Sequence, residues 1–367
     1  MRSHLRCRAF VIVMRAKRHK SANRRKKRFY AIDLFSGCGG LTLGLRQAGF
    51  DVIAAIENDP LAAEAYKANH PGVALKETDI KKLSPKRLRS ELGMRCGDLD
   101  LLAGCPPCQG FSNLRTRNGA RGNRDSRNDL VREMLRFTKA FVPKVVMMEN
   151  VPGLSSRKAF RELCDGLRKL GYDVIWDIKD VARFGVPQRR RRLILLAGRG
   201  FEISFAPESS RLRTVRDAIS RIPRAGKSRD KLHNLPERRS NKVLRLIRDI
   251  PKDGGSRLDL PTRRQLMCHR RSDGFYDIYG RMAWDEVAPT ITSGCFNPSK
   301  GRFLHPCEDR AITMREAALL QSFPKSYQFP TSAGKQAIAL MIGNALPPEF
   351  IRRQAQQVIR VLKMPSP

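Results

Sequence analysis

The chain has 367 residues, 41% of them hydrophobic, and its 72 Lys and Arg against 35 Asp and Glu give a formal net charge of +37. This length and apolar content exclude a wholly disordered chain and leave room for two domains with a sizeable core. A cationic excess of this size is not needed for solubility. It indicates a polyanionic partner, for which nucleic acid is the first candidate.

Neither a membrane segment nor a secretory context is expected. The apolar run AFVIVM at 9–14 is too short for a signal core or a membrane span. The nine cysteines follow no regular framework, which is typical of free thiols in a reducing cytoplasm. The block 15–28 holds nine Lys or Arg in fourteen positions. Such a run repels itself, so residues 1–28 are expected to form a basic, disordered tail.

Beyond the tail, short apolar runs alternate with segments of helical spacing. The expected buried strands are FYAIDLF (29–35), FDVIAAIEND (50–59), DLDLLAGC (98–105), KVVMMENV (144–151), YDVIWDI (172–178) and RRLILLAG (191–198). Helices are expected over 41–49, 60–70 and 130–141, with Pro60 at the first position of the second. This alternation predicts an α/β fold with a parallel sheet that is covered by helices on both faces.

The composition changes after about residue 200. Residues 207–272 are rich in Arg, Pro, Gly and Ser and contain only short helical pieces, at 214–222 and 242–250. This segment predicts a second, smaller domain that is basic and rich in loops.

Regular structure is expected to return near the carboxyl end of the chain. Thr313 and Glu316 have the spacing of a capping box at the start of a helix over 313–323. A final helix is expected from near Pro347, because 350–362 carries an apolar face at helical spacing.

A glycine-rich turn joins the first expected strand to the first helix, in DLFSGCGGL at 33–41. Glycines at this place let the backbone approach a ligand in the crevice beyond the strand ends. Glu57 ends the second strand, where a carboxylate can hold ribose hydroxyls, and Asp79 is expected to end the third, where it can accept from an adenine amine. Together they favour a cofactor that contains adenosine, and the spacing does not distinguish a nicotinamide from a sulfonium cofactor.

Two cysteines enclose a pair of prolines in GCPPCQGFS at 104–112. No second Cys-x-x-Cys and no His pair at ligand spacing accompany them, so zinc is not expected. The prolines and the lack of a thioredoxin-like unit disfavour a redox pair. A buried structural cysteine fits Cys105 but not Cys108, which leads into a polar loop. Cys108 is therefore predicted to be a nucleophile, because a thiolate is strongly nucleophilic even when sparsely populated.

A nucleophile needs partners, and two segments supply candidates. The strand KVVMMENV is apolar until Glu149 and Asn150, and a carboxyl that is partly desolvated there favours its protonated form, which suits a donor to a ring nitrogen. In PQRRRRL (187–193), strand alternation places Gln188, Arg190 and Arg192 on one face and the other two arginines on the opposite face. One arginine set is expected to face the active edge of the sheet.

In this order, DLFSGCGG, PPCQGFS, ENV, QRRRR and GNALPP (343–348) resemble the motifs of the C5-cytosine DNA methyltransferases, especially bacterial modification enzymes, over about residues 29–363. Further segments that resemble the family are RDSRNDL (124–130), TVRDAI (214–219), APTITSG (288–294) and ITMREAALLQSFP (312–324). Cys105 stands where glycine is common and Leu346 where valine is common, and neither departure puts activity in serious doubt.

The resemblance implies a fold and its division. The fold is a Rossmann-like S-adenosylmethionine-dependent methyltransferase sheet with a second, smaller target-recognition domain. The catalytic domain would span 29–204 and be completed by 335–363, and the target-recognition domain would span 205–334.

The resemblance also implies S-adenosylmethionine as the cofactor, with no metal. The cofactor would lie over Phe35, Ser36, Gly37, Cys38, Gly39 and Gly40. Glu57 would bind the ribose and Asp79 would lie near the adenine amine, with Asn58 and Ile80 beside them. The same pocket would be lined by Pro107, Leu130 and Asn344.

The implied reaction is methyl transfer to C5 of a cytosine that has been flipped out of duplex DNA. Cys108 would attack C6, Glu149 would protonate or hydrogen-bond N3, and Asn150 would support the catalytic loop. Arg190 and Arg192 would contact the O2 atom of the base and the loop.

Double-stranded DNA is the expected partner, bound by a monomer in the bacterial cytoplasm, where the bound protein is associated with the nucleoid. A restriction endonuclease that acts on the same site is a further candidate partner. One alternative is a tRNA cytosine-5 methyltransferase, but those relatives carry a Cys-Phe-Thr signature that is not found here. A second alternative is a catalytically inactive DNA-binding regulator. An NAD dehydrogenase fits the glycine turn but explains neither PPCQ nor QRRRR.

Overall fold

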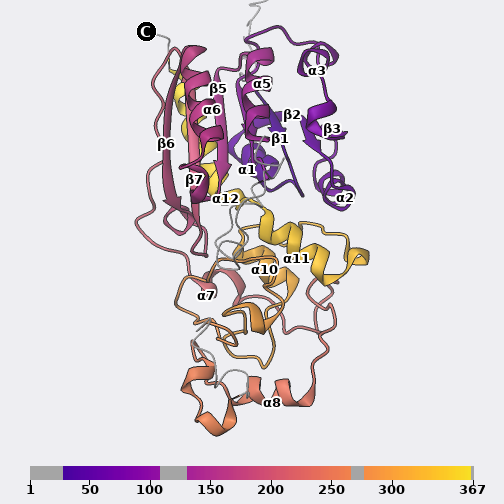
Figure 1. The fold of residues 1–367 in the computed structure, drawn as a ribbon. Coiled ribbons are helices and arrows are strands. Elements are labelled where there is room, and N and C mark those ends of the chain that lie inside the picture. The colour runs from indigo at the N-terminus through magenta and orange to yellow at the C-terminus, as the bar shows by residue number, and fades with distance from the viewer. Residues whose placement is uncertain (1–27, 108–129, 266–276, 365–367) are drawn as a thin grey trace, which may run out of the picture.

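A computed structural model of the protein describes residues 28–107, 130–265 and 277–364. Most of the expected basic tail and the predicted nucleophile Cys108, with the segment that follows it to residue 129, lie outside the described residues. The described part consists of a sheet with its helices and, at one end of it, a second region built from short helices and loops (Figure 1).

Seven strands form one sheet in the order β3-β2-β1-β4-β5-β7-β6. Their bounds are β1 (Phe29–Leu34), β2 (Phe50–Glu57), β3 (Ala74–Glu77), β4 (Leu101–Gly104), β5 (Val145–Asn150), β6 (Tyr172–Asp180) and β7 (Arg191–Arg199). All six apolar runs that predict strands are confirmed. The third strand ends at Glu77, two residues earlier than expected, because Asp79 already caps a short 3-10 helix over Ile80–Lys82.

The prediction of an all-parallel sheet is wrong at one strand. β7 pairs antiparallel with both β5 and β6, whereas β1, β2, β3, β4 and β5 pair in parallel. The connection from β6 to β7 holds only residues 181–190 and no α-helix. Parallel neighbours need a longer crossover, so a connection this short reverses the chain.

Helices cover both faces of the sheet, as predicted (Figure 1). One face packs on α3 (Pro85–Glu91), α5 (Val131–Phe141) and α6 (Lys158–Lys169), around an apolar cluster that includes Phe137 and Leu163. The other face packs on α1 (Gly40–Ala48) and α12 (Pro348–Lys363), around Leu45 and Phe350. The remaining helix of this half, α2 (Pro60–Asn69), has Pro60 at its first position and Asp59 as its cap, so its predicted start is confirmed.

The second region lies at the end of the sheet in Figure 1 and contains α7 (Val215–Ile219), α8 (Asn241–Asp249), α10 (Met314–Leu320) and α11 (Gly334–Asn344). The predicted capping box is present, with the Thr313 side chain on the Glu316 backbone and the Glu316 side chain on the Thr313 backbone. Helix α11 is not anticipated by the sequence pattern. Its residues are apolar on most sides, so no amphipathic spacing marks it, and it is buried in a cluster with α10.

One buried cation organises the loops around α8. The Arg281 side chain is fully buried and pairs with Asp309 at 2.6 Å. Its guanidinium also donates to the backbone carbonyls of Ile247, Ile250, His305 and Glu308.

Among the residues that the structure describes, no helix is both long and apolar enough to cross a membrane.

The close approach of α1 and α12 depends on Gly44. A Cβ atom at this position would lie 2.5 Å from the Pro348 carbonyl oxygen and 2.7 Å from the Ile351 Cβ. We expect Gly44→Ala to lower the free energy of unfolding by about 1–2 kcal/mol, because the overpacking cost exceeds the gain of about 1 kcal/mol in helix propensity. Urea denaturation measures this, and Gln47→Ala on the exposed face of α1 is the control. A stabilised Gly44→Ala protein would contradict the close contact.

Candidate active site

The predicted site residues gather at the carboxyl edge of the sheet. The glycine turn follows β1, Glu57 ends β2, Pro107 stands three residues after β4, and Glu149 and Asn150 end β5. β1, β4 and β5 are adjacent and parallel, so their ends lie side by side at one edge. Open α/β sheets bind ligands in the crevice beyond such an edge.

Glu57 fixes the shape of the glycine turn. Its Oε2 atom accepts the Gly37 backbone N–H at 2.7 Å, and its Oε1 atom accepts the backbone N–H groups of Asn58 and Asp59 at 2.9 and 2.8 Å. Phe35 and Gly37 both have positive φ, of 63° and 55°. Oε2 keeps a further lone pair, which can accept a ligand hydroxyl.

Gly39 is required by the residue that lies beneath it. Its φ is 95°, and a Cβ atom would meet His70 Nε2 at 2.4 Å. His70 Nε2 lies 3.1 Å from the Gly39 carbonyl oxygen and 3.0 Å from the Tyr327 hydroxyl, which donates to the Cys38 carbonyl. Burial lowers the pKa of His70 to about 4, so the imidazole is neutral at neutral pH. A neutral, buried pair thus supports the turn from below, and no periodic pattern in the sequence predicted this pair.

A second buried group supports the start of the turn. The Asp33 side chain is fully buried, and its Oδ2 accepts the Thr42 hydroxyl at 2.7 Å. The Thr42 oxygen lies 2.9 Å from the Tyr66 hydroxyl. Burial raises the pKa of Asp33 to about 7, which outweighs the opposing hydrogen bond from Thr42. The strand β1 and the helices α1 and α2 are therefore joined by one polar chain beneath the candidate cofactor crevice.

The glycine turn also contacts the GNALPP segment, which lies about three hundred residues further along the chain. A Cβ atom on Gly40 would meet the Leu346 carbonyl oxygen at 2.6 Å, and the Cys38 thiol lies 3.7 Å from the Met341 carbonyl oxygen. Asn344, at the end of α11, is exposed next to this contact. The structure thus brings the predicted cofactor residues of the turn close to the segment that carries Asn344.

Four further predicted cofactor residues lie outside the glycine turn. Asp79 is half-buried and accepts the Lys81 backbone N–H at 3.0 Å, and the next residue, Ile80, is buried in the core. Leu130 immediately precedes α5 and packs against the same apolar cluster, and Pro107 is half-buried.

Glu149 is buried between a cation and a thiol. Its side chain pairs with Arg192, whose Nε lies 2.7 Å from Glu149 Oε1. The Cys105 thiol lies beside the same carboxyl, because β4 and β5 are in register with Gly104 opposite Met148. Burial raises the pKa of Glu149, and Arg192, Arg190 and Cys105 oppose that rise. The group is therefore held nearer to its protonated form than an exposed glutamate.

Asn150 holds the strand end that leads to Cys108. Its Nδ2 donates to the Pro106 carbonyl oxygen at 3.0 Å, and its Oδ1 accepts the Val151 backbone N–H at 2.8 Å. Pro106 stands two positions before Cys108 in the sequence. Asn150 therefore fixes the backbone from which the predicted catalytic loop departs.

The predicted alternation in QRRRR is confirmed. Gln188 and Arg190 are buried and Arg192 is nearly so, while Arg189 and Arg191 are exposed. Arg190 donates to the Ile291 carbonyl at 2.9 Å and to the Gly343 carbonyl at 2.7 Å. Its two terminal nitrogens thus join the APTITSG and GNALPP segments.

A ladder of amides runs beside Arg190. Gln188 Oε1 accepts the Ile291 backbone N–H at 2.8 Å, and Gln188 Nε2 donates to Gln321 Oε1 at 2.7 Å. Gln321 Nε2 in turn donates to the Ile342 carbonyl at 2.6 Å. Gln321 lies in ITMREAALLQSFP, a segment that resembles the family, but no role was predicted for it from the sequence.

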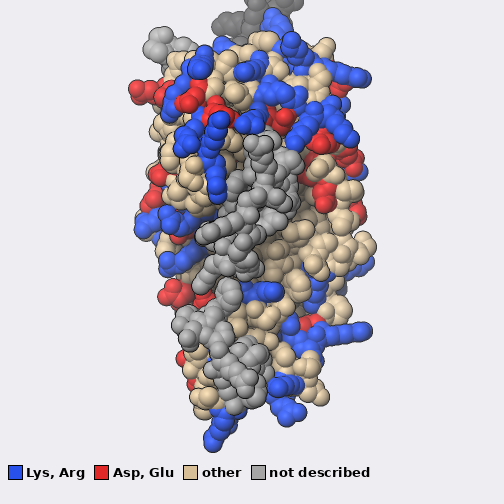
Figure 2. All heavy atoms as spheres, viewed as in Figure 1, with Lys and Arg blue, Asp and Glu red and all other residues tan. Residues whose placement is uncertain are grey.

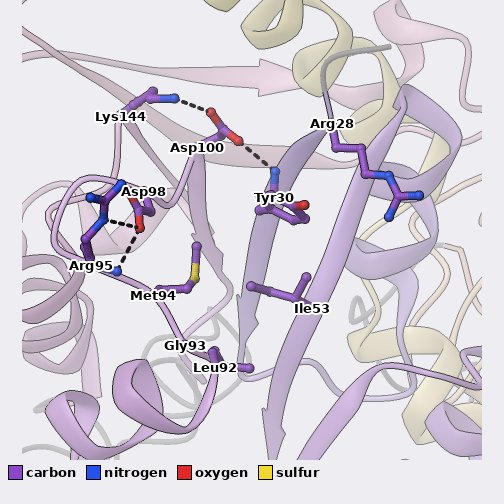
Figure 3. A pocket seen from close by; sticks show the side chains of 10 residues that line it. All are labelled: Arg28, Tyr30, Ile53, Leu92, Gly93, Met94, Arg95, Asp98, Asp100 and Lys144. Carbon is purple, nitrogen blue, oxygen red and sulfur yellow. Dashed lines mark hydrogen bonds and ion pairs between the residues drawn. The ribbon is translucent and has the colours of Figure 1, made fainter. Parts of the chain in front are cut away.

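A separate recess lies at the opposite edge of the sheet, near the amino ends of β1 and β4 (Figure 3). It has a volume of about 560 Å³ and is lined in part by Tyr30, Asp100 and Lys144. Both Asp100 oxygens are already engaged, one by the Lys144 ammonium at 2.7 Å and one by the Tyr30 backbone N–H at 2.8 Å. Its place and its satisfied carboxylate argue against a catalytic role.

The basic charge is not confined to one patch. Figure 2 shows Lys and Arg side chains over the viewed face from the sheet to the α8 end. Exposed basic residues of the second region include Arg211, Arg213, Arg221, Arg224, Lys227, Arg229 and Lys231. Such a surface suits contacts with phosphates.

The fold and the cofactor crevice define the class of the protein, an α/β methyltransferase that depends on S-adenosylmethionine. Residues 29–360 match the family model of the C-5 cytosine-specific DNA methylases, and the chain belongs to this family. The resemblance drawn from the motifs is thereby confirmed. The protein is a DNA (cytosine-5)-methyltransferase with S-adenosylmethionine as the methyl donor.

Similar proteins cover nearly the whole chain. The Type II methylase M.HgiDII of Herpetosiphon aurantiacus is 35% identical over 348 residues, which cover 90% of this chain and 95% of that protein. The Type II methyltransferase M.XorII of Xanthomonas oryzae is 34% identical over 370 residues, with 90% and 85% covered.

Two solved structures share the fold. A putative DNA modification methyltransferase encoded within a prophage in E. coli has a TM-score of 0.71 at 23% identity and covers 92% of this chain and 100% of its own. The Dnmt2 methyltransferase of S. pombe has a TM-score of 0.61 at 21% identity, with the same coverage.

The buried Asp33 predicts a pH dependence of stability. An unfolded aspartate has a pKa of about 3.9, whereas that of Asp33 in the folded protein is about 7. Between these values the folded state holds a proton that the unfolded state has lost, so the free energy of unfolding falls as pH rises, by about 4 kcal/mol at most. Asp33→Asn retains an acceptor for Thr42 without this titration.

We therefore expect the stability of Asp33→Asn, relative to the unsubstituted protein, to increase between pH 5 and pH 8. Urea denaturation at several pH values measures the difference, with Asp173→Asn on the exposed face of β6 as the control for loss of one carboxyl. Parallel stability curves for Asp33→Asn and the unsubstituted protein would show that Asp33 does not titrate in this range.

Proposed function

We propose that Cys108 is the nucleophile of this methyltransferase and that Glu149 is the acid that acts on the target cytosine. The observation that carries this proposal is the environment of Glu149. Its carboxyl is buried at the carboxyl edge of β5, paired with Arg192, and has a raised pKa. It also lies beside the strand that continues into Pro107 and Cys108.

The cofactor site proposed for S-adenosylmethionine is the crevice above the glycine turn. The turn 35–40 would approach the cofactor through its backbone, Glu57 would accept a ribose hydroxyl, and Asp79 would accept the adenine amine. Asn58, Ile80, Pro107, Leu130 and Asn344 would complete the walls. The bound cofactor supplies an electrophilic methyl group. The fit is supported by Gly37, around which a Cβ atom would meet no protein atom within 4 Å, and by the free lone pair on Glu57 Oε2.

In the proposed reaction, the Cys108 thiolate forms a bond to C6 of the flipped cytosine. The protonated Glu149 donates to N3, so the electron pair displaced from the C5–C6 double bond makes C5 nucleophilic, and C5 takes the methyl group while S-adenosylhomocysteine leaves. A base then removes the C5 proton, and the returning electron pair expels Cys108. Extruding the cytosine costs a few kcal/mol, which phosphate and groove contacts of the basic surface would offset.

The two arginines receive different proposed roles. Arg192 lies against Glu149, so it would orient the carboxyl of Glu149 and contact the O2 atom of the base. Both terminal nitrogens of Arg190 already donate hydrogen bonds, one to the Ile291 carbonyl and one to the Gly343 carbonyl. We therefore assign Arg190 a positioning role, and Asn150 the support of the catalytic loop through Pro106.

We propose that residues 205–334 form the target-recognition domain, which would select the DNA sequence to be methylated. Residues 29–204 and 335–363 would form the catalytic domain. The relatives named Type II methylases support a role in restriction and modification. We propose that the protein acts as a monomer on duplex DNA in the cytoplasm, associated with the nucleoid, and protects the site of a partner endonuclease.

The nucleophile is tested by trapping. Duplex DNA with 5-fluorocytosine at the target should form a covalent complex that resists denaturant, because fluorine cannot leave C5 as a cation and Cys108 cannot then be expelled. The complex should need S-adenosylmethionine to be irreversible, and peptide mapping should place it on Cys108. Glu149→Gln should slow trapping by at least about tenfold, as expected when a general acid is lost.

Cys108→Ala should give no adduct while it still binds S-adenosylmethionine. An adduct on Cys105, or methylation of the correct site without trapping, would overturn the assignment. Transfer to tRNA but not to duplex DNA would overturn the substrate, and cofactor binding without any transfer would indicate an inactive DNA-binding regulator.

The recognition segment is tested by exchange. Residues 205–310 are basic, and those of them that the structure describes are irregular and contribute no strand to the sheet. A hybrid that carries this segment from a relative with another target should methylate the target of the donor, as shown by sequencing for 5-methylcytosine. An active hybrid that keeps the original target would place specificity elsewhere.

A further inference from the structure

Cys105 occupies a fixed position beside the proposed acid. β4 and β5 are paired in parallel with Gly104 opposite Met148, so the next residues along the two strands, Cys105 and Glu149, are neighbours on the same face. The Cys105 backbone N–H donates to the Leu34 carbonyl at 3.2 Å and so extends the ladder to β1 by one residue. The following carbonyl, of Pro106, accepts from Asn150. The backbone on both sides of the thiol is therefore held.

This register places the Cys105 thiol beside the Glu149 carboxyl, where it can donate to it. Burial and the neighbouring carboxyl raise the pKa of Cys105 well above its ordinary value, so the sulfur carries its proton and acts as a donor. On its other side, Glu149 contacts Arg192 from β7. The charged and titratable groups around this pair are Arg190, Arg192 and, towards β1, Asp33.

We propose that Cys105 is a positioning residue for the methyl-transfer reaction, whose thiol proton fixes the Glu149 carboxyl against Arg192 and helps to set the pH at which Glu149 gives up its proton. This inference rests on the acid role proposed for Glu149. Cys105 itself forms no bond to the substrate. A glycine at this position would leave that side of the carboxyl without a contact.

The direction of the expected pH shift follows from the role of the Cys105 thiol as a hydrogen-bond donor. A thiol that donates to a carboxylate stabilises the ionised form of Glu149, and its removal makes ionisation harder. Methyl transfer requires protonated Glu149, so the rate declines on the alkaline side as Glu149 ionises. Removal of the thiol should therefore move this alkaline limb to higher pH. A serine hydroxyl, which is a stronger donor, should move it back.

The test is the pH profile of single-turnover methyl transfer to duplex DNA at saturating S-adenosylmethionine. Cys105→Ala should shift the alkaline limb upward by about half a pH unit, the size expected for the loss of one modest hydrogen bond. Cys105→Ser should return the limb to the original position or below it. Both proteins should still bind S-adenosylmethionine, as measured by calorimetry, which separates positioning from a folding defect.

The same comparison in a Glu149→Gln background separates the two proposals. If Glu149 is the acid, Glu149→Gln removes the alkaline limb, and adding Cys105→Ala then changes nothing further in the profile. If Glu149→Gln keeps the limb, the acid role of Glu149 is wrong. If Glu149→Gln removes the limb but Cys105→Ala and Cys105→Ser both leave it in place, or both shift it equally, only the role of Cys105 is overturned.

Discussion

The ion pair between Glu149 and Arg192 depends on the direction of a single strand. β7 runs antiparallel to β5, with Leu193 opposite Asn150, so its amino end lies at the carboxyl edge of the sheet. A parallel β7 would carry QRRRR to the far edge, where the Asp100 recess lies. The reversed strand supplies a buried carboxyl with its cation, without which the ionised form would be left unpaired at a cost of several kcal/mol. It also brings Gln188 and Arg190 to the APTITSG segment and to the segment that carries Asn344, a proposed cofactor residue.

The glycine turn is also held in its shape by contacts within the protein. Its backbone is held from one side by Glu57 and from below by His70 and Tyr327, and the strand that leads into it carries the buried Asp33 one residue before its end. These contacts exist within the folded chain, so the turn does not need a ligand to impose its shape. A preformed site loses less conformational entropy on binding than one that must be ordered.

The sequence predicted the elements that local patterns encode. Buried strands such as KVVMMENV are continuous apolar runs, Pro60 marks a helix start, and Thr313 with Glu316 marks another, and each of these is confirmed. The direction of β7 was missed because strand direction depends on the length and path of the connection, which periodicity does not record. The contacts of His70, Gln321 and Arg190 were missed for a related reason. Each joins segments that are far apart in the chain, and one sequence contains no signal for such pairs.

The junction between QRRRR and APTITSG is made largely through main-chain atoms. The Arg189 N–H donates to the Ala288 carbonyl at 2.8 Å, and the Ala288 N–H donates to the Pro187 carbonyl at 3.2 Å. The Arg190 side chain donates to the Ile291 carbonyl. Every residue except proline offers the same backbone groups. Side chains within the loops that precede this junction can therefore diverge over evolution without disturbing how those loops are anchored. If these loops read the DNA sequence as proposed, point changes in them would alter the sequence preference and leave the carboxyl edge of the sheet unchanged.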